Sequence, residues 1–440
     1  MTPPSDCCPA DPTGPMAPPN APGILTRAQA LERLLARARP VVGRETLPLS
    51  AALDRVLAAP IHSPIDVPGW DNSAMDGYAL RVADLAPAGG RLRVAQRIPA
   101  GRAGAPLVAG TAARIFTGAP IPPGADTVVI QEVCQVEGET LIPPAVVKPG
   151  ANIRRAGEDI RAGAEIIATG TLLLPQHLGL AASVGIGELC LYRRPRVAVL
   201  ASGDELVMPG QPLGPGQIYN SNRFTLRGLL DALGCEVIDL GQVADNLEAT
   251  LAALQRGAAE ADLVLASGGV SVGEEDHVKP AVERLGRLDL WKVAIRPGKP
   301  LACGHLGPGA ATTIMPPDWD APGTPFIGMP GNPVSLFVTF CLFVRPFIRR
   351  LRGISGDLAP RPWWLPAGFE WPKAGGREEF PRARLVPDAE RGLEVRLYPS
   401  HSSAVLSSVT WAEGLAVIPI GQTLRQGDPV QFLPLRELQP

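Results

Sequence analysis

The residues best suited to chemistry lie between Leu263 and Asp276, in the stretch LVLASGGVSVGEED. Its first four residues, 263–266, are apolar, which is typical of a buried strand of a parallel sheet. Small residues follow, and they allow the backbone to approach a ligand and to turn its N–H groups toward it. These small residues are Ser267, Gly268, Gly269, Ser271 and Gly273. Three acidic residues, 274–276, then stand where a helix is expected to begin, which is electrostatically favourable.

Two interpretations of this stretch are open. Unit charges about 4 Å apart at an effective dielectric of about 20 interact by roughly 4 kcal/mol. A phosphate beside these carboxylates therefore needs a cation, and Mg²⁺ is the usual one. One interpretation is a phosphate-and-metal loop at the carboxyl end of a strand, where open α/β sheets bind ligands. The other is an ordinary turn between a strand and a helix, with an acidic residue as the helix cap. The loop alone favours neither.

Two further stretches carry groups that bind anions. Arg296-Pro297-Gly298-Lys299-Pro300 places two cations in a stiff turn, which suits a phosphate or another oxyanion. The alternative is a solvated surface turn. Pro330-Gly331-Asn332-Pro333 precedes an apolar helix with Ser335 in its first turn, and free N–H groups at a helix start bind anions. Together with the acidic residues Glu205, Asp245 and Asp276, which all follow expected strands, these stretches suggest a ligand with several phosphates or oxyanions.

A separate segment, DVPGWDNSAMDGYAL (66–80), is rich in turn-forming and hydrogen-bonding residues. Function concentrates in exposed loops of this kind, and Asp76 is its strongest candidate. For most of the segment, a simple turn that enters a β-domain is the better interpretation. The stretch FTGAP (116–120) offers the hydroxyl of Thr117 at a strand end, or uses it only to satisfy the turn.

Composition excludes several classes of protein. The chain has 440 residues, 45% of them hydrophobic, and a net charge of −2. It is therefore expected to form two to four domains, and nothing in its charge suggests nucleic acid or membrane as a partner. Its seven cysteines are scattered without a CxxC pair, which favours the reducing cytoplasm and argues against a zinc site. No secretory signal is visible, and the longest apolar run is too short to span a bilayer.

The periodicity of the sequence predicts several kinds of domain. The residues up to Pro22 are Pro-rich and are expected to form a disordered tail. A helix from Thr26 to Ala38, capped by Thr26, comes next, and a short one is expected from Ser50 to Leu57. Short strands from about 91 to 147 predict a small β-barrel-like domain, and strands beyond 361 predict a second β-domain. Between them, alternating strands and helices from Arg196 predict a three-layer α/β domain with a mostly parallel sheet, and its last helix is interrupted at Pro346.

Seven motifs now stand in one order along the chain. They are DNSAMDGYA (71–79), FTGAP (116–120), RRAGED (154–159), SGDEL (202–206), SGGVSVGEED (267–276), RPGKP (296–300) and PGNPVS (330–335). In this order they resemble the bacterial molybdopterin molybdenumtransferases, the MoeA family, which is similar to the E domain of gephyrin. The resemblance extends from about residue 24 to the C-terminus.

The resemblance implies a multidomain α/β plus β fold. It comprises a disordered tail (1–22), an elongated connecting domain in two parts (23–62 and 150–192), a small β-barrel-like domain (63–149), a MogA-like α/β substrate-binding domain (193–356) and a C-terminal β-barrel domain (357–440). It implies a cytoplasmic homodimer. The implied partners are a molybdopterin adenylyltransferase and molybdoenzyme maturation factors, with neither nucleic acid nor a membrane.

The implied activity belongs to molybdenum cofactor biosynthesis. The enzyme takes molybdate and adenylylated molybdopterin, cleaves the phosphoanhydride with Mg²⁺, inserts molybdenum into the dithiolene, and releases molybdenum cofactor and AMP. Two alternatives are the adenylyltransferase that makes the preceding intermediate and a non-catalytic, gephyrin-like scaffold. The adenylyltransferase would not need the two β-domains, and a scaffold would not need the acidic residues.

The resemblance also assigns residues. Asp76, Thr117, Glu205, Asp245 and Asp276 match functional positions, with Asp245 and Asp276 as the Mg²⁺ ligands. Lys299, Pro300, Arg382 and Ser403 resemble a molybdate site. The remaining substrate-binding positions are Ser267, Gly268, Gly269, Ser271, Gly273, Arg296, Pro330, Asn332, Pro333 and Ser335. Two features depart from the family pattern. Arg296 stands where a lysine is common, and an insertion lies between Leu306 and Pro325.

Overall fold

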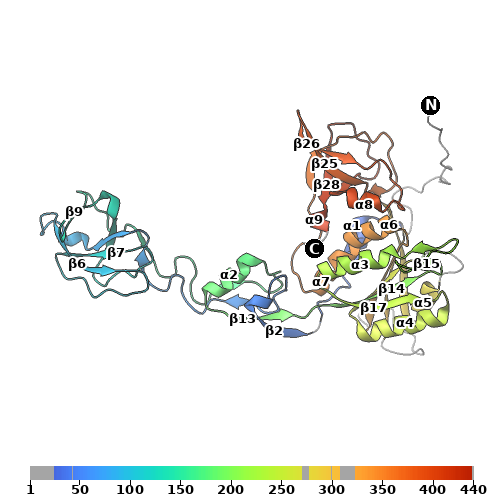
Figure 1. Cartoon of the computed structure of the whole chain (residues 1–440), viewed down its shortest axis with the longest axis horizontal. Coiled ribbons are helices and arrows are strands. Elements are labelled where there is room, and N and C mark those ends of the chain that lie inside the picture. The colour runs from blue at the N-terminus through green and yellow to red at the C-terminus, as the bar shows by residue number, and fades with distance from the viewer. Residues whose placement is uncertain (1–23, 42, 270–276, 299, 308–322, 439–440) are drawn as a thin grey trace. The chain divides into compact units, whose positions relative to one another are not determined.

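The structure is a computed structural model that describes residues 24–41, 43–269, 277–298, 300–307 and 323–438. Contacts between residues divide the chain into two units. Figure 1 shows the chain coloured by residue number. Unit 1 comprises residues 1–45, 54–56 and 192–440, and unit 2 comprises residues 46–53 and 57–191. The predicted tail and most of the predicted insertion lie outside the described residues.

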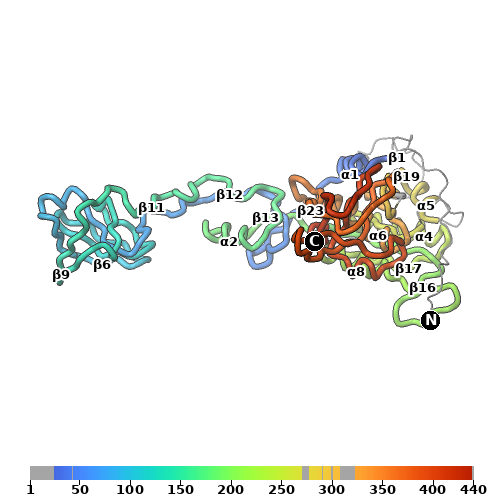
Figure 2. Tube along the Cα trace, turned by 90° about the horizontal axis from the view of Figure 1, so that it is seen from above, coloured from blue at the N-terminus to red at the C-terminus, as the bar shows by residue number. Residues whose placement is uncertain are grey.

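Unit 1 is built on a seven-stranded sheet in the order β1-β19-β21-β22-β18-β14-β17. Four strands, β22, β18, β14 and β17, run parallel to one another, while β21 is antiparallel to both of its neighbours. Figure 2 shows β1 beside β19, with which it pairs in parallel. The bounds are Ile24–Leu25 (β1), Arg196–Ser202 (β14), Glu236–Val243 (β17), Leu263–Ser267 (β18), Gly286–Val293 (β19), Pro300–Leu306 (β21) and Thr324–Met329 (β22). The predicted mostly parallel sheet is confirmed.

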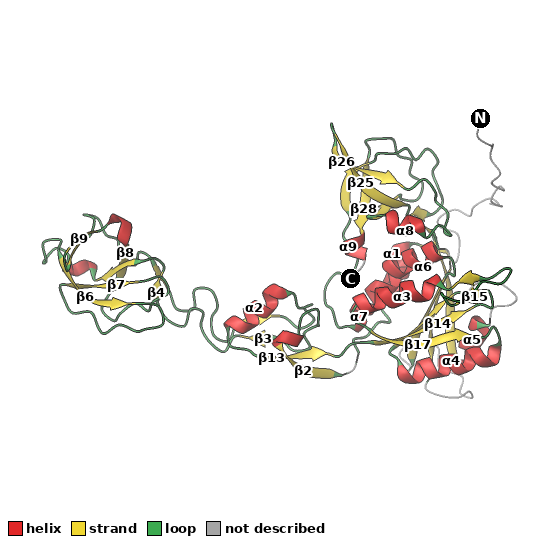
Figure 3. Cartoon of the chain, viewed as in Figure 1, coloured by secondary structure: helices red, strands yellow, loops and turns green. Residues whose placement is uncertain are grey.

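Helices cover both faces of this sheet because each central strand is apolar on both sides. On β14, Val197 and Val199 pack into one core while Ala198 and Leu200 pack into another. The first core contains residues of α1, α3, α6 and α7, and the second contains residues of α4 and α5 (Figure 3). The helices span Arg27–Leu35 (α1), Ser221–Ala232 (α3), Leu247–Glu260 (α4), Val278–Leu285 (α5), Pro333–Thr339 (α6) and Arg345–Leu351 (α7). The predicted three-layer architecture is confirmed.

Side-chain caps fix where these helices begin. Thr26 accepts a hydrogen bond from the Gln29 N–H, and the Gln29 side chain accepts one from the Thr26 N–H, which forms a capping box. Asn220 caps α3 and Asn246 caps α4 in the simpler way, each accepting from an N–H three residues later. The predicted cap at Thr26 is confirmed. Asn220 and Asn246 place the starts of α3 and α4 next to strand ends.

The apolar helix expected after Pro333 is interrupted, as predicted from Pro346. A π-helical segment, Phe340–Val344, separates α6 from α7, and all five of its residues are buried. Proline lacks an N–H, so an α-helix that runs through Pro346 leaves a carbonyl group one turn earlier without its partner, and a wider turn is a common solution. No helix among the described residues has the length and apolarity needed to cross a membrane.

The C-terminal part of unit 1 is a five-stranded sheet in the order β23-β28-β27-β25-β26. Its edge strands approach each other, because Ala367 forms a bridge with Val395 and the Gly368 N–H donates to the Val395 carbonyl. The sheet is thereby closed in the manner of the predicted barrel. Its strands are Trp363–Pro366 (β23), Arg382–Asp388 (β25), Gly392–Leu397 (β26), Gly414–Val417 (β27) and Pro429–Pro434 (β28), with short helices Ser407–Trp411 (α8) and Leu435–Leu438 (α9).

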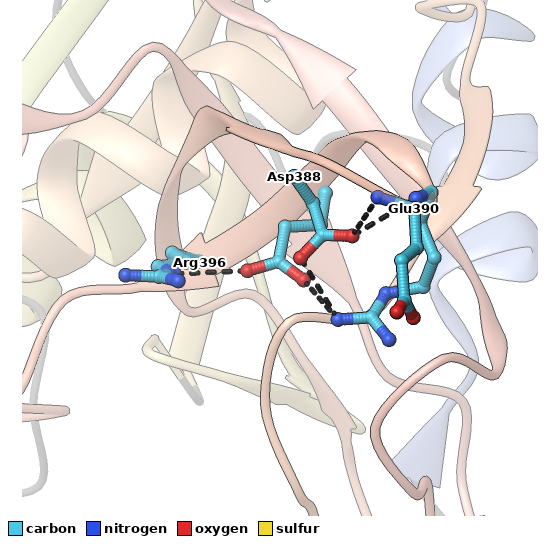
Figure 4. A network of polar contacts seen from close by, with 5 residues as sticks. Asp388, Glu390 and Arg396 are labelled. Atoms are coloured by element: carbon cyan, nitrogen blue, oxygen red, sulfur yellow. Dashed lines mark hydrogen bonds and ion pairs between the residues drawn. The ribbon is translucent and has the colours of Figure 1, made fainter.

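A charged network occupies the turn between β25 and β26. Figure 4 draws it around Asp388, Glu390 and Arg396. Glu394, whose side chain is 1% exposed, accepts hydrogen bonds from Arg391 at 3.1 Å and from Arg396 at 3.0 Å. Asp388 caps the turn by accepting from the N–H groups of Glu390 and Arg391. A buried carboxylate requires such partners, so the network fixes the conformation of this hairpin.

Unit 2 contains a six-stranded sheet in the order β8-β5-β7-β6-β10-β9. Adjacent residues of its strands, such as Ala112 and Ala113, pack into different cores, so both faces are covered. The bounds are Gly77–Leu80 (β5), Leu92–Ile98 (β6), Thr111–Ile115 (β7), Thr127–Ile130 (β8), Gln135–Glu137 (β9) and Thr140–Ile142 (β10). This is the small β-domain expected from the sequence.

The rest of unit 2 is a set of two-stranded sheets and one helix, Pro175–Ser183 (α2). Strand β11 (Ile153–Arg154) pairs with β4 (Asn72–Ser73), and β12 (Glu165–Ile167) pairs with β3 (Ile61–His62). The short helix predicted from Ser50 to Leu57 is wrong. Only a 3₁₀ turn forms, at Leu49–Ala51, because Asp54 adopts a positive φ of 58° that a helix does not permit.

Candidate functional site

The first part of the site is the carboxyl edge of β14 and β17. The Ser202 hydroxyl donates to Oδ1 of Asp245 at 3.3 Å, and the Asp245 N–H donates to Oδ1 of Asp204 at 3.4 Å. Two carboxylates and a hydroxyl therefore meet at one edge of the sheet, as the order of the strands predicts. Glu205 lies on the same loop, but Asp204 is the residue that accepts the hydrogen bond from Asp245. The sequence interpretation overlooked Asp204, although it lies inside the quoted motif SGDEL.

The second part joins the glycine loop after β18 to the loop after β22. Gly268 and Gly269 have φ values of 83° and 66°, which glycine adopts most readily. A Cβ added at Gly331 would lie 3.7 Å from the Cα of Gly268, so the two loops are in contact. Asn222 bridges them: its Nδ2 donates to Oγ of Ser267 at 3.0 Å and to the Gly331 carbonyl at 2.7 Å. Asn222 stands in the first turn of α3, and no motif singled it out.

The third part surrounds the start of α6. A Cβ at Gly298 would come within 2.8 Å of Oγ1 of Thr339 and 3.9 Å of Cγ of Pro330. Only glycine therefore fits at this point of the RPGKP turn, which lies against α6. Ser335 is 5% exposed. The expectation of free N–H groups at this helix start needs correction, because the Val334 N–H donates to the Ser403 carbonyl at 3.0 Å.

The fourth part is Arg382, at the start of β25. It is a buried cation, 2% exposed, whose guanidinium group donates to the carbonyl oxygens of Ser400 and Ser402 and to the Ser408 hydroxyl. These contacts order the serine-rich loop that also holds Ser403. Since Ser403 contacts Val334, the loop around Arg382 meets the start of α6. The structure thus brings together Arg382, Ser403 and Ser335, which are far apart in the sequence.

Two further side chains, Glu379 and His401, lie near the arginines of this region, Arg296 and Arg382. Glu379 lies 3.4 Å from Nη1 of Arg296, and its side chain is only 12% exposed. Burial raises the pKa of Glu379, an effect that the charge of Arg296 partly reverses. His401 packs edge-on against Trp371, with 5.3 Å between the ring centroids, and desolvation lowers its pKa, as do Arg382 and Arg296. Neither Glu379 nor His401 was predicted as a site residue.

A separate pair of predicted residues, Asp76 and Thr117, lies in unit 2. Oδ1 of Asp76 accepts hydrogen bonds from the Thr117 N–H at 2.8 Å and from the Thr117 hydroxyl at 2.7 Å. These two donors lower the pKa of Asp76, with a smaller effect from Arg114. The two candidates, 41 residues apart in the sequence, therefore form one side-chain pair, so Thr117 does more than satisfy its own turn.

Two other quoted motifs support this pair by fixing the loop that carries Asp76. Asp71 accepts hydrogen bonds from the Ala156 N–H at 2.9 Å and from Arg155 at 2.6 Å, and these contacts lower the pKa of Asp71. Strand β11 of the RRAGED region pairs with β4, which follows Asp71 directly. The motifs DNSAMDGYA and RRAGED are therefore two sides of one structure.

Some predicted site residues lie outside the described residues. They are Ser271, Gly273, Asp276 and Lys299. Of Pro300, only its position at the start of β21 is described. Asn332 and Pro333 are placed at the start of α6.

The donors at the acidic edge fit Mg²⁺ chemically. Magnesium prefers hard oxygen ligands and is commonly bound by one or two carboxylates. Asp245 and Asp204 supply these, and the hydrogen bond from the Asp245 N–H to the Asp204 carboxylate at 3.4 Å keeps them adjacent. Within the described residues no group of three or more His, Cys, Asp or Glu side chains is arranged as a metal site. Asp276 lies outside that part of the chain.

An open α/β sheet with a glycine loop and carboxylates at its carboxyl edge, combined with two β-domains, defines a class of enzymes that act on a phosphate-bearing ligand. Three family models match in sequence order: the MoeA N-terminal region (domains I and II) at 25–185, a probable molybdopterin-binding domain at 198–350, and the MoeA C-terminal region (domain IV) at 365–435. Together these matches follow the order expected from the seven motifs.

Full-length relatives agree with these models. The molybdopterin molybdenumtransferase of Haemophilus influenzae is 41% identical over 390 residues, which covers 88% of this chain and 92% of the relative. The enzyme of the same name from a Nostoc species is 37% identical over 427 residues, covering 94% of each. A crystal structure of the molybdopterin biosynthesis MoeA protein from Pyrococcus horikoshii has a TM-score of 0.77 and 27% identity, covering 93% of this chain and all of that one. The chain belongs to the molybdopterin molybdenumtransferase family and is an enzyme.

Proposed function

We propose that this enzyme inserts molybdenum, taken from molybdate, into adenylylated molybdopterin in molybdenum cofactor biosynthesis, and that molybdenum cofactor and AMP are released. Membership of the family supports molybdenum insertion. The observation that carries the proposal is the meeting of the glycine loop with the Pro330–Ser335 loop, joined by the two hydrogen bonds of Asn222. The acidic edge lies beside them, because a Cβ added at Gly268 would lie 3.5 Å from the Ser202 carbonyl oxygen. This edge offers backbone N–H groups and carboxylates to one ligand, as phosphate binding with a cation requires.

The roles of the residues follow from their chemistry. Asp245 and Asp276 would hold Mg²⁺, with Asp204 adjacent to Asp245, and bound Mg²⁺ would offset the charge on the phosphate that leaves with AMP. Ser267, Gly268 and Gly269 lie at the phosphates, with the Gly268 N–H already donating to the Met329 carbonyl at 3.1 Å. Arg296, Lys299, Arg382 and Ser403 bind molybdate, since cations and hydroxyl groups suit an oxyanion. In unit 2, the carboxylate of Asp76 orients the hydroxyl of Thr117, and we propose both as catalytic residues.

Molybdate-dependent AMP release tests this proposal. Purified enzyme receives adenylylated molybdopterin and Mg²⁺ with or without molybdate, and the variants Asp245→Ala and Asp276→Ala are compared with Asp231→Ala. Asp231 is a matched control because its half-exposed carboxylate pairs with Arg227 on the outside of α3. We expect release by the wild type and the control, and at least a hundredfold slower release, about 3 kcal/mol in barrier, by the two site variants.

Other outcomes identify other functions. Pterin binding without AMP release by any protein would indicate a scaffold. Formation of the adenylylated pterin from ATP would indicate an adenylyltransferase. Release that continues unchanged in Asp245→Ala and Asp276→Ala would reject the metal assignment.

We propose a homodimer in the cytoplasm and the six-part domain division stated from the sequence. The five cysteines described by the structure are all free thiols, which supports a reducing compartment. Light scattering coupled to size-exclusion chromatography tests the dimer, because a mass near 46.2 kDa would show a monomer. Interaction with an adenylyltransferase or with maturation factors is the remaining expectation, and pull-down with those purified proteins tests it.

A further inference from the structure

The Asp76–Thr117 pair depends on two short exposed segments that must keep a fixed register. Asp76 immediately precedes β5, and Thr117 follows the end of β7 by two residues. Thr117 itself is exposed, so little packing restrains its side chain. One oxygen of Asp76 accepts both donors of Thr117, and a small shift of either strand end would break this arrangement.

Arg114, on β7, contacts the residues on either side of this pair. Its Nη1 donates to the carbonyl of Gly77, the residue after Asp76, at 2.9 Å. Its guanidinium group lies over the ring of Phe116, the residue before Thr117, at 4.6 Å from the centroid, and over the ring of Tyr78 at 5.1 Å. A planar cation between these rings is held by cation–π attraction on each contact. The Arg114 side chain therefore contacts both segments that carry the pair.

A third contact of Arg114 completes a closed set of hydrogen bonds around Asp76. Arg114 donates through Nη2 to the side-chain oxygen of Gln131. The Gln131 N–H in turn donates to the carbonyl of Asp76 itself at 3.1 Å. The carbonyls of Asp76 and Gly77 are thus both held, the first by Gln131 and the second by Arg114. These hydrogen bonds restrain the backbone from which the Asp76 carboxylate projects.

The backbone here leaves little room for adjustment. A Cβ at Gly77 would lie 2.0 Å from the carbonyl oxygen of Val129, so β5 and β8 approach more closely than any other residue permits. Gly118, directly after Thr117, has a φ of 81°. Neither glycine provides a side chain that could restrain the pair, so Arg114 adds a restraint to those from Asp71 and from the β4–β11 pairing.

We propose that Arg114 is a positioning residue of this enzyme: it holds Asp76 and Thr117 in the arrangement in which one carboxylate oxygen accepts both donors of the threonine. The proposal rests on the proposed role of this pair in the reaction. Arg114 acts on the pair through Gly77, Phe116 and Gln131 and does not touch the substrate. Its charge has a smaller effect on the pKa of Asp76 than the Thr117 donors do, which is consistent with a geometric role.

The experiment uses the full-length enzyme with Arg114→Met, Arg114→Lys and, as a matched control, Arg93→Met. Arg93 is an exposed arginine on the neighbouring strand β6, paired in register with Thr111 at the other end of β7. The first measurement is the pKa of the Asp76 carboxyl by ¹³C NMR, assigned with Asp76→Asn. The second is kcat and KM for AMP release.

We expect Arg114→Met to raise the pKa of Asp76 toward its ordinary value and to lower kcat by about tenfold or more with KM little changed, because misplaced groups lose rate more than binding. Arg114→Lys restores charge without the planar contacts, so kcat stays low. Arg93→Met changes neither quantity. A pKa of Asp76 that is unchanged in a folded Arg114→Met enzyme would overturn the proposal.

Two further variants keep the outcomes separate. If Arg114→Met does not fold, Gln131→Leu removes one anchor of Arg114 at an exposed position, and a smaller rise in the pKa of Asp76 is expected; no rise would count against the proposal. Asp76→Asn tests the pair itself. Unchanged activity in Asp76→Asn would reject the catalytic role of the pair, while the NMR measurement would still decide whether Arg114 positions it.

Discussion

At the scale of single residues, the site depends on polar side chains that join loops distant in the sequence. Asn222 is the clearest, because its amide group connects Ser267 to the Gly331 carbonyl. Asn222→Leu keeps the size of the side chain and removes both bonds. We expect a KM for adenylylated molybdopterin raised about tenfold and a free energy of unfolding lowered by about 1–3 kcal/mol.

Steady-state kinetics and urea unfolding measure these effects. Gln255→Leu, at an exposed position of α4, is the matched control and should change neither quantity. A KM for Asn222→Leu equal to that of the wild type would mean that the two loops do not need this bridge.

For Glu379 we expect the opposite effect, because removing its charge should strengthen the binding of molybdate. It neutralises part of the charge of Arg296, which we propose as a molybdate ligand. Ion pairs at the protein surface contribute about 0.2–1 kcal/mol, and Arg296 is 47% exposed, so Glu379→Gln should bind molybdate up to about fivefold more tightly by calorimetry. Burial raises the pKa of Glu379, so the wild type gains the same advantage as pH falls and its carboxyl becomes protonated. The affinities of the two proteins should therefore converge in acid.

Glu378→Gln is the control for this prediction. Glu378 is the neighbouring residue, but it pairs with Arg27 at 2.8 Å. Equal affinities for molybdate in wild type and Glu379→Gln at neutral pH would show that Arg296 does not bind the oxyanion.

Some of the candidate residues could be predicted from the sequence and others could not, and the difference has a physical reason. Asp76 and Thr117 stand inside distinctive motifs, so the sequence predicts both as site residues, and the structure shows their contact. Asn222 and Glu379 act through contacts across 45 and 83 residues, and their local sequence looks like an ordinary helix start and a short strand. Only the tertiary fold gives such side chains their partners, which a pattern in one segment does not contain.

At the scale of elements, periodicity predicted the α/β layers well because buried strands and amphipathic helices have distinct spacing. It failed at Ser50–Leu57, where composition is helical but Asp54 takes a positive φ and Leu57 forms a bridge with Leu191. A strand partner more than a hundred residues away overrides a weak local preference. The interruption near Pro346 was predictable because proline acts through its own missing N–H.

The β25–β26 hairpin makes a prediction about stability. Glu394→Gln keeps the shape that packs against Gly368, where an added Cβ would lie 2.6 Å from the carboxylate carbon. It weakens the bonds from Arg391 and Arg396. Hydrogen bonds to charged groups are each worth about 1.5–3 kcal/mol, and both arginines are partly exposed, so we expect a loss of about 1–3 kcal/mol in the free energy of unfolding.

Glu390→Gln serves as the control in the same turn (Figure 4). Its side chain is exposed, and its effect should stay within about 0.5 kcal/mol. If urea unfolding gave both variants the same stability, the network around Glu394 would contribute nothing to the hairpin.

At the scale of the whole molecule, several carboxylates make stability depend on pH. Asp262 is half-buried, and burial alone would raise its pKa, yet hydrogen bonds from Arg193 and from the Arg196 N–H hold it below the ordinary value. The pKa of Asp71, Asp84 and Asp388 is lowered as well. A carboxyl whose pKa is lower in the folded state stabilises above its unfolded pKa of about 3.9 and loses this contribution as pH falls through the folded value.

The free energy of unfolding should therefore decrease steeply below about pH 4 and depend little on these groups at neutral pH. Thermal unfolding followed by circular dichroism between pH 3 and 7, about the range where such groups titrate, measures this. Asp262→Asn should be less stable at pH 7 and show a shallower decline in acid, whereas Asp231→Asn should follow the wild type. An identical acid slope in Asp262→Asn would exclude Asp262 as a contributor.

The pairing of β1 with β19 has a consequence for synthesis on the ribosome. Ile24 lies opposite Lys292, so the second residue of each pair emerges 268 residues after the first. At a synthesis rate of roughly 5–20 residues per second, β1 is synthesised about 13–54 seconds before its partner β19. Most of unit 2, residues 57–191, is complete well before that time. Strand β1 therefore meets its partner late in translation, and until then its backbone is available to chaperones.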